Sequence, residues 1–446
     1  MKQKSKFLWF LMGLGSEMQI IASLSFTELF SLLAAPFLFM RYHQEMKRDG
    51  IMPFFILSIC VFIGCVIACQ VNHTVFQAAL RGYSVTAIIP CSIITSYWLI
   101  RRDANGFKWF LLGAALSTVL STFAFQKAVE ITGSAGGTSG AEAVEAIMNG
   151  PIYVTGRLRG FITLLTQGWY LHTPILLDIP ASLFYALFAI LTTVSGRSAS
   201  LSAFAFVAIL LIGGKKMQTM KKRICQRFWL LVILGVIGVF VVKNVYSTAA
   251  SQGWLGEEAL KKYEGQTKGD KSLMGLLLGG RMESFCGVLA CVDKPIVGFG
   301  PWARDRYGYI DEFITKYGKP EDVEALIRSQ MDGNAGGEYL IPCHSYITGF
   351  WVGYGIFGLV FWLYVLFVLF RYLKEDCWAV PQWFAWLACA IPGYCWNVFF
   401  SPLGNRFTPF IFIVACLMAR AVRRGIFQLP MEMQCEMWEN EQKRRG

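Results

Sequence analysis

The sequence is short of charge and of histidine. Only 16% of its 446 residues are Asp, Glu, Lys or Arg, four are His, and 55% are hydrophobic. A soluble protein of this length needs more polar surface than that to cover its core. The mean hydropathy of +0.47 agrees. The composition therefore argues against a soluble enzyme and predicts an all-α polytopic membrane protein that lies in a lipid bilayer.

Several sequence patterns that indicate a particular chemistry are missing. The 13 cysteines include no CxxC pair, which argues against a zinc site or a dithiol redox centre. The chain has no P-loop, no HExxH motif and no GxSxG nucleophile motif. It also has no DxD pair to hold the metal of a nucleotide sugar, and no nucleic-acid motif accompanies the net charge of +12. We therefore expect no cofactor, no metal site and no nucleic-acid partner.

Apolar runs long enough to cross a bilayer recur along the chain, and Lys and Arg gather between them, as in cytoplasmic loops. The densest basic cluster lies at 215–223, and placing it inside gives about twelve transmembrane helices with both termini cytoplasmic. The first apolar tract, 7–40, is split at Ser25, which begins a capping box with Glu28. The other expected spans lie near 52–70, 76–100, 107–126, 160–177, 181–194, 199–213, 228–243, 345–370, 381–400 and 407–420.

The polar segments divide the chain into four parts. Residues 1–243 hold the N-terminal spans and an outer loop at 127–156, and residues 244–342 form a large extracytoplasmic loop. Residues 343–424 hold the C-terminal spans, and 425–446 form a cytoplasmic tail. In the large loop we expect two short helices, one at about 281–292 and one beginning at Pro320. Cysteines 286, 291 and 343 lie there too and could pair if the loop is extracytoplasmic.

Basic residues at the outer membrane surface need an explanation, because the orientation rule depletes positive charge there. In this topology they are Arg81, Arg157, Arg159, Arg197, Arg281 and His344. One explanation is contact with lipid headgroups. The other, which we favour, is a shared cationic pocket for a lipid diphosphate, since guanidinium groups bind phosphate oxygens in pairs and stay charged. The imidazole of His344 can accept a proton near neutral pH or orient a hydroxyl.

The stretch from 279 to 358 joins a polar loop to the start of an apolar helix. Arg281 and Glu283 stand at its beginning, and the loop continues to Gly298-Phe-Gly300-Pro301-Trp302. His344 follows, just before a glycine-rich helix start. We take Glu283 and Trp302 as further candidates for binding a substrate.

In combination, three short motifs give the chain a resemblance to the O-antigen ligase and O-antigen polymerase superfamily of bacterial cell envelopes. The first is Ser195-Gly196-Arg197 at the outer end of a helix. The second is Arg281 followed by Pro295-Ile-Val-Gly298-Phe-Gly300, and the third is His344 followed by Gly353-Tyr-Gly355-Ile-Phe-Gly358. Two departures stand out: Gly196 interrupts the Ser-Arg step of the family, and Ser345 stands where Asn is usual.

The resemblance implies a GT-C-like helical fold and metal-independent transfer of a glycan from a polyprenyl-diphosphate donor outside the cytoplasmic membrane. We expect Arg197, Arg281 and His344 to be catalytic. The residues expected to bind the lipid diphosphate or the glycan are Arg81, Arg157, Arg159, Glu283 and Trp302. The acceptor would be a glycan, a lipid core or a protein, so a polymerase stays open beside the ligase that we prefer.

A lipid-linked glycan flippase or other transporter is the alternative from a different class. Transporters tend to place ionisable residues and broken helices near the middle of the bilayer. The notable charges of this chain are instead expected at one surface, beside a large loop, which favours an enzyme.

Overall fold

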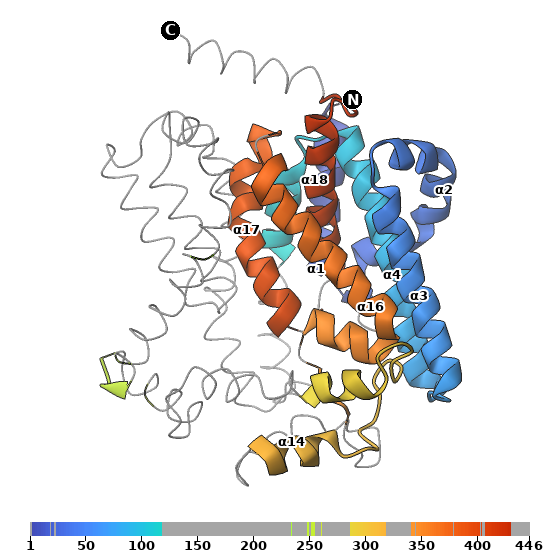
Figure 1. Ribbon diagram of the computed structural model, residues 1–446. Coiled ribbons are helices and arrows are strands. Elements are labelled where there is room, and N and C mark those ends of the chain that lie inside the picture. Colours follow the sequence, from blue (N-terminus) through green and yellow to red (C-terminus); the bar gives the residue numbers. More distant parts are fainter. Residues whose placement is uncertain are drawn as a thin grey trace, which may run out of the picture.

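The computed structural model describes residues 2–17, 19–21, 24–117, 286–317, 340–343, 345–377, 379–401, 403 and 406–429, with isolated positions between 233 and 260. These parts form a bundle of helices, with a loop region beyond one end (Figure 1). The longer helices are α1 (Lys2–Glu17), α2 (Phe26–Arg48), α3 (Met52–Val71), α4 (Phe76–Arg102), α14 (Tyr309–Tyr317), α16 (Tyr346–Arg371), α17 (Pro381–Phe400) and α18 (Thr408–Arg423). Shorter helices span Phe107–Ser117 and 286–293, and a π-helical turn, η2 (Tyr372–Asp376), extends α16.

Three helices in the described ranges are long and apolar enough to cross a membrane: α3, α4 and the continuous stretch Tyr346–Asp376. α4 packs against α2, α3 and α18, while α16 packs against α3 and α17. The ring of Phe54 on α3 stacks on Phe361 of α16, with centroids 5.4 Å apart. Apolar side chains such as Phe37, Ile56 and Leu80 remain exposed, as expected for a surface that contacts lipid.

The helices expected at 52–70, 76–100, 345–370, 381–400 and 407–420 are confirmed to within three residues at each end. The capping box is confirmed as well: the Ser25 hydroxyl accepts the Glu28 N–H, and the Glu28 carboxylate accepts the Ser25 N–H. The loop helix predicted at about 281–292 is seen from 286 to 293. The four expected spans between 160 and 243, the outer loop and the second loop helix fall outside the described residues, apart from isolated positions.

A pair of short strands and one loop helix were not predicted. Strands β1 (Gln19–Ile21) and β2 (Leu24–Ser25) form a small antiparallel pair between α1 and α2. Strands this short contain too few residues for a period of two to be recognised. Helix α14 lies in what was expected to be an irregular loop; the Asp305 carboxylate accepts the N–H groups of Tyr309 and Ile310 at its start, at 2.9 and 2.8 Å.

Several basic helix ends lie together at one end of the bundle. Arg101, near the end of α4, donates a hydrogen bond of 2.7 Å to Asp49, which follows α2. Its guanidinium also lies 5.9 Å from the ring centre of Phe427, just after α18. Arg423 of α18 pairs with Asp376 at 2.6 Å. The turn between α3 and α4 is consequently at the opposite end of these helices, beside the loop region (Figure 1).

Helix α16 is broken at Gly355, whose backbone angles of φ 62° and ψ −147° are not helical. The preceding loop enters this break. The N–H of Phe299 donates to the carbonyl of Val352 at 2.6 Å, and the N–H of Ile356 donates to the carbonyl of Ile296 at 3.0 Å. The break leaves backbone N–H and C=O groups of α16 without their helical partners, and the loop forms hydrogen bonds with them. Unpaired backbone groups would be costly in a segment within a membrane.

Position 298 requires glycine for two reasons, its left-handed φ of +75° and the closeness of α16. A Cβ there would lie 2.6 Å from the Val352 carbonyl oxygen and 2.7 Å from the Gly355 nitrogen. Gly50 is a matched control, because its φ is +79° and a Cβ would meet nothing within 4 Å. We expect Gly298→Ala to lower the free energy of unfolding by about 2–4 kcal/mol, against about 1 kcal/mol for Gly50→Ala.

Thermal unfolding of the two variants in detergent measures this difference. Equal losses for Gly298→Ala and Gly50→Ala would mean that contact between the loop and α16 contributes nothing to stability.

Candidate functional site

A pocket of about 250 Å³ lies where α3 turns into α4. One wall is the turn and the first part of α4, and the other is the loop from 294 to 307 together with Leu340. The charged or proton-binding nitrogen groups that line it are His73, Arg81, Lys294, Arg304 and Arg306. None of the described lining residues is acidic. The pocket therefore offers a strongly positive potential to any anion that enters it.

The ammonium group of Lys294 is held in place by neutral partners. It donates to the side-chain oxygen of Asn72 at 2.8 Å and lies 4.7 Å from the ring centre of Phe299. Asn72 in turn donates to the carbonyl of Gly298 at 3.1 Å, which links the end of α3 to the loop. Since these partners carry no negative charge, the charge of Lys294 stays available to a ligand.

Arg81 and Arg306 are both exposed, and no acidic side chain in the described ranges forms an ion pair with either. Arg81 lies on the second turn of α4, whereas Arg306 lies on the loop that faces it. Guanidinium groups approaching from two sides suit a ligand with several anionic oxygens, such as a phosphate or a carboxylate.

Among the described residues, His73 and Trp302 are the two with positive φ that are not glycine, at 46° and 49°, and both line this pocket. His73 follows the C-cap of α3, where a left-handed residue commonly ends a helix. Trp302 has no such role, and a bulky residue in that region is strained. The preceding Pro301 packs directly against Gly82 of α4, which holds this backbone in place.

A small core supports the loop side of the pocket. The Tyr309 hydroxyl donates to the Asp293 carboxylate at 2.7 Å, and burial together with this bond raises the pKa of Tyr309. The N–H of Ile341 donates to the carbonyl of Ala303 at 2.8 Å. Cysteines 286, 291 and 343 lie in this region and form no disulfide, so the pairing considered from the sequence is not present. Burial raises the pKa of Cys291 to about 12.

The structure describes Arg81 and Trp302 among the predicted site residues, and it brings these two together on one pocket. The others lie outside the described residues: Arg157, Arg159, Arg197, Arg281, Glu283 and His344. Ser345, directly after His344, is the N-cap of α16, and its hydroxyl accepts the Thr348 N–H at 2.9 Å. Serine is among the residues preferred at a helix N-cap.

The sequence interpretation missed three pocket residues, Lys294, Arg304 and Arg306. Basic side chains in a long polar loop are usually solvated, so their number gave no reason to single them out. A usable signal was their position on both sides of the Pro295–Gly300 motif.

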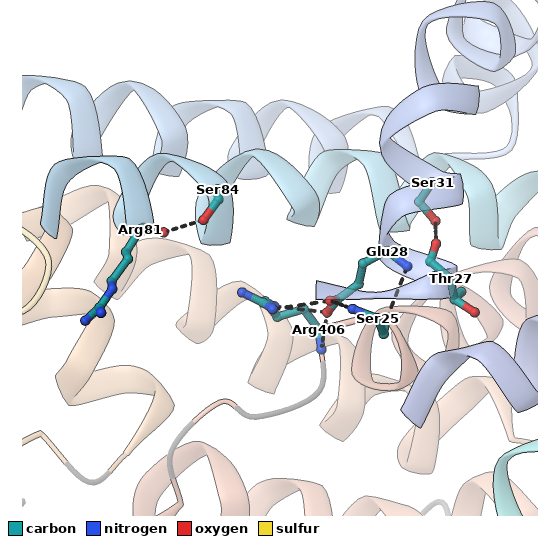
Figure 2. A network of polar contacts seen from close by, with 7 residues as sticks. All are labelled: Ser25, Thr27, Glu28, Ser31, Arg81, Ser84 and Arg406. Atoms are coloured by element: carbon teal, nitrogen blue, oxygen red, sulfur yellow. Dashed lines mark hydrogen bonds and ion pairs between the residues drawn. The ribbon is translucent and has the colours of Figure 1, made fainter. Parts of the chain in front are cut away.

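A second polar network lies inside the bundle, and Figure 2 shows it together with Arg81. Glu28 and Arg406 form an ion pair of 2.9 Å whose side chains are 3% and 8% exposed. A second bond of 3.2 Å joins the same groups, and the Arg406 N–H also donates to Glu28. The Glu28 carboxylate also caps α2 through Ser25, so its oxygens are fully engaged. This pair joins the start of α2 to the segment before α18, whereas Arg81 is not part of it.

Comparison with protein-family models and with curated proteins finds no match to this chain.

Proposed function

We propose that this protein is a glycosyltransferase of the O-antigen ligase type. It would move a glycan from a polyprenyl-diphosphate carrier to an acceptor hydroxyl at the outer face of the bacterial cytoplasmic membrane. The observation that carries the proposal is the basic pocket at the end of helices long enough to span a membrane. Arg81 and Trp302 were chosen from the sequence for this role, and they share that pocket.

The distribution of charge supports the orientation. The cluster of basic helix ends around Arg101 and Arg423 would face the cytoplasm, as the positive-inside rule requires. The pocket lies at the other end of the same helices and would then face outward. The diphosphate of a polyprenyl carrier lies at that depth in the outer leaflet.

In the proposed mechanism, Arg197 and Arg281 hold the diphosphate and stabilise the charge that develops on it as the glycosidic bond breaks. An acceptor hydroxyl attacks the anomeric carbon from the opposite side, which inverts its configuration, and the carrier diphosphate leaves with the electron pair. His344 takes the hydroxyl proton or orients the acceptor. Guanidinium groups supply the positive charge that this step needs, so the proposal calls for no metal.

The remaining predicted residues would bind the donor around this centre: Arg81, Arg157, Arg159, Glu283 and Trp302. A polymerase would use the same chemistry with a second lipid-linked glycan as acceptor, and it stays the alternative within the class.

A transporter is less well supported. The break in α16 at Gly355 is filled by the loop, so its backbone groups are bonded within the protein rather than presented to a substrate. The buried charges of Glu28 and Arg406 likewise satisfy each other. The basic groups with room for a ligand are at one end of the described helices.

Glycan analysis of a strain that lacks the gene tests the function. A ligase predicts loss of the attached surface glycan and accumulation of long lipid-linked chains on the outer leaflet. Accumulation of single lipid-linked repeats would indicate the polymerase. Lipid-linked glycan retained on the cytoplasmic leaflet would indicate the transporter and contradict the proposal.

A further inference from the structure

The basic pocket also contains aromatic side chains that a diphosphate does not need. Phe299, Trp302 and Tyr307 line it beside the cationic groups. Trp302 is 42% exposed and Tyr307 is 63% exposed, so each has ring surface that the described protein leaves uncovered. A diphosphate is charged on every side and gains little from an aromatic ring. A sugar ring gains more, because its C–H face is apolar while its substituents are polar.

The tyrosine ring is held in a fixed position. Tyr307 packs against Phe299 and Tyr309, with ring centres 5.8 and 5.9 Å apart. The Lys294 ammonium lies 5.6 Å from the Tyr307 ring centre. An aromatic platform and a cation are thus fixed side by side, an arrangement that suits a sugar ring carrying an anionic substituent.

We propose that this pocket binds an acidic sugar residue of the glycan, with the ring on Tyr307 or Trp302 and its carboxylate or phosphate ester on the basic groups. These groups are Arg81, Lys294, Arg304 and Arg306. The inference rests on the proposed function, because it takes the glycan to be the substrate, and it narrows that substrate to acidic glycans. An acidic phospholipid fits less well, since its glycerol headgroup has no apolar ring face to place on Tyr307 or Trp302.

Binding of trigalacturonate and of its methyl ester to the full-length protein in detergent tests this inference. The two probes differ in charge and share their ring faces. We expect the acid to bind at least about tenfold more tightly than the ester, and its affinity to fall as salt is added. Arg306→Gln and Tyr307→Ala should each weaken binding of the acid by about tenfold. Arg424→Gln, which changes an exposed arginine after α18, should not alter it.

Arg306 and Tyr307 are both exposed, so thermal unfolding should show that the two variants are folded. Equal binding of acid and ester would overturn the inference. So would displacement of the acid by inorganic diphosphate or by short-chain phosphatidylglycerol at lower concentrations than the acid itself requires, since the pocket would then belong to a carrier or lipid headgroup. This binding assay does not depend on transfer activity. If the protein binds the acid but the deletion strain keeps its surface glycan, the proposed function is rejected and the acidic-sugar site is not.

Discussion

Replacement of Arg281 by alanine should reduce glycan transfer by about 100-fold or more while the protein stays folded and inserted. A guanidinium that stabilises charge on a leaving diphosphate acts mainly in the transition state, and loss of one such donor has effects of this size. Arg281→Lys should recover part of the rate, because it keeps the charge but cannot form the paired hydrogen bonds. Transfer is measured in membranes that contain equal amounts of each variant.

Arg424→Ala is the control for Arg281→Ala, since it removes an exposed arginine that follows α18 and does not line the basic pocket. It should leave transfer unchanged. Product at the wild-type level from Arg281→Ala would remove Arg281 from the site, and with it the part of the mechanism that depends on a shared cationic cavity.

Replacement of Glu28 by alanine should lower the free energy of unfolding by about 3–5 kcal/mol, because it leaves the buried guanidinium of Arg406 without its carboxylate. Replacing both members with apolar residues, Glu28→Leu with Arg406→Met, should destabilise less than the single change. Chemical unfolding in detergent measures each variant. Glu312→Ala, at an exposed position on α14, is the control and should change stability by less than about 0.5 kcal/mol.

A loss below about 1 kcal/mol for Glu28→Ala would contradict this account of the pair. It would mean that water or another group replaces the carboxylate at Arg406, and that the junction between α2 and α18 does not depend on the ion pair.

Local signals were enough to predict most of the described helices. The capping box at Ser25 marked the start of α2, and the gap between the apolar runs 52–70 and 76–100 separated α3 from α4. Apolar runs of bilayer length fixed the spans between them. The start of α14 was missed because its cap, Asp305, looks like any other acidic residue of a polar loop.

The interlocking of the loop with α16 was beyond the reach of local patterns. The glycines at 298 and 355 were both noticed in the sequence, but as separate motifs. Both glycines are needed because the backbones at 298 and 355 pack against each other. These positions are 57 residues apart, and the spacing within either motif does not predict that they meet.

Only part of the pocket was predicted, again because local patterns do not show which segments meet in the fold. Arg81 was selected because the topology placed a charge at an unfavourable depth, and Trp302 was selected as part of the loop stretch from Gly298 to Trp302. The loop packs against the turn after α3, and only this contact brings Lys294, Arg304 and Arg306 into the pocket.

Reconstitution in liposomes distinguishes glycan transfer from transport of the donor. Purified protein in liposomes would receive a fluorescent polyprenyl-diphosphate glycan and an acceptor, with a chelator present. We expect glycan joined to the acceptor, with free polyprenyl diphosphate released in equal amount. Movement of the intact donor across the bilayer, with no diphosphate released, would contradict it.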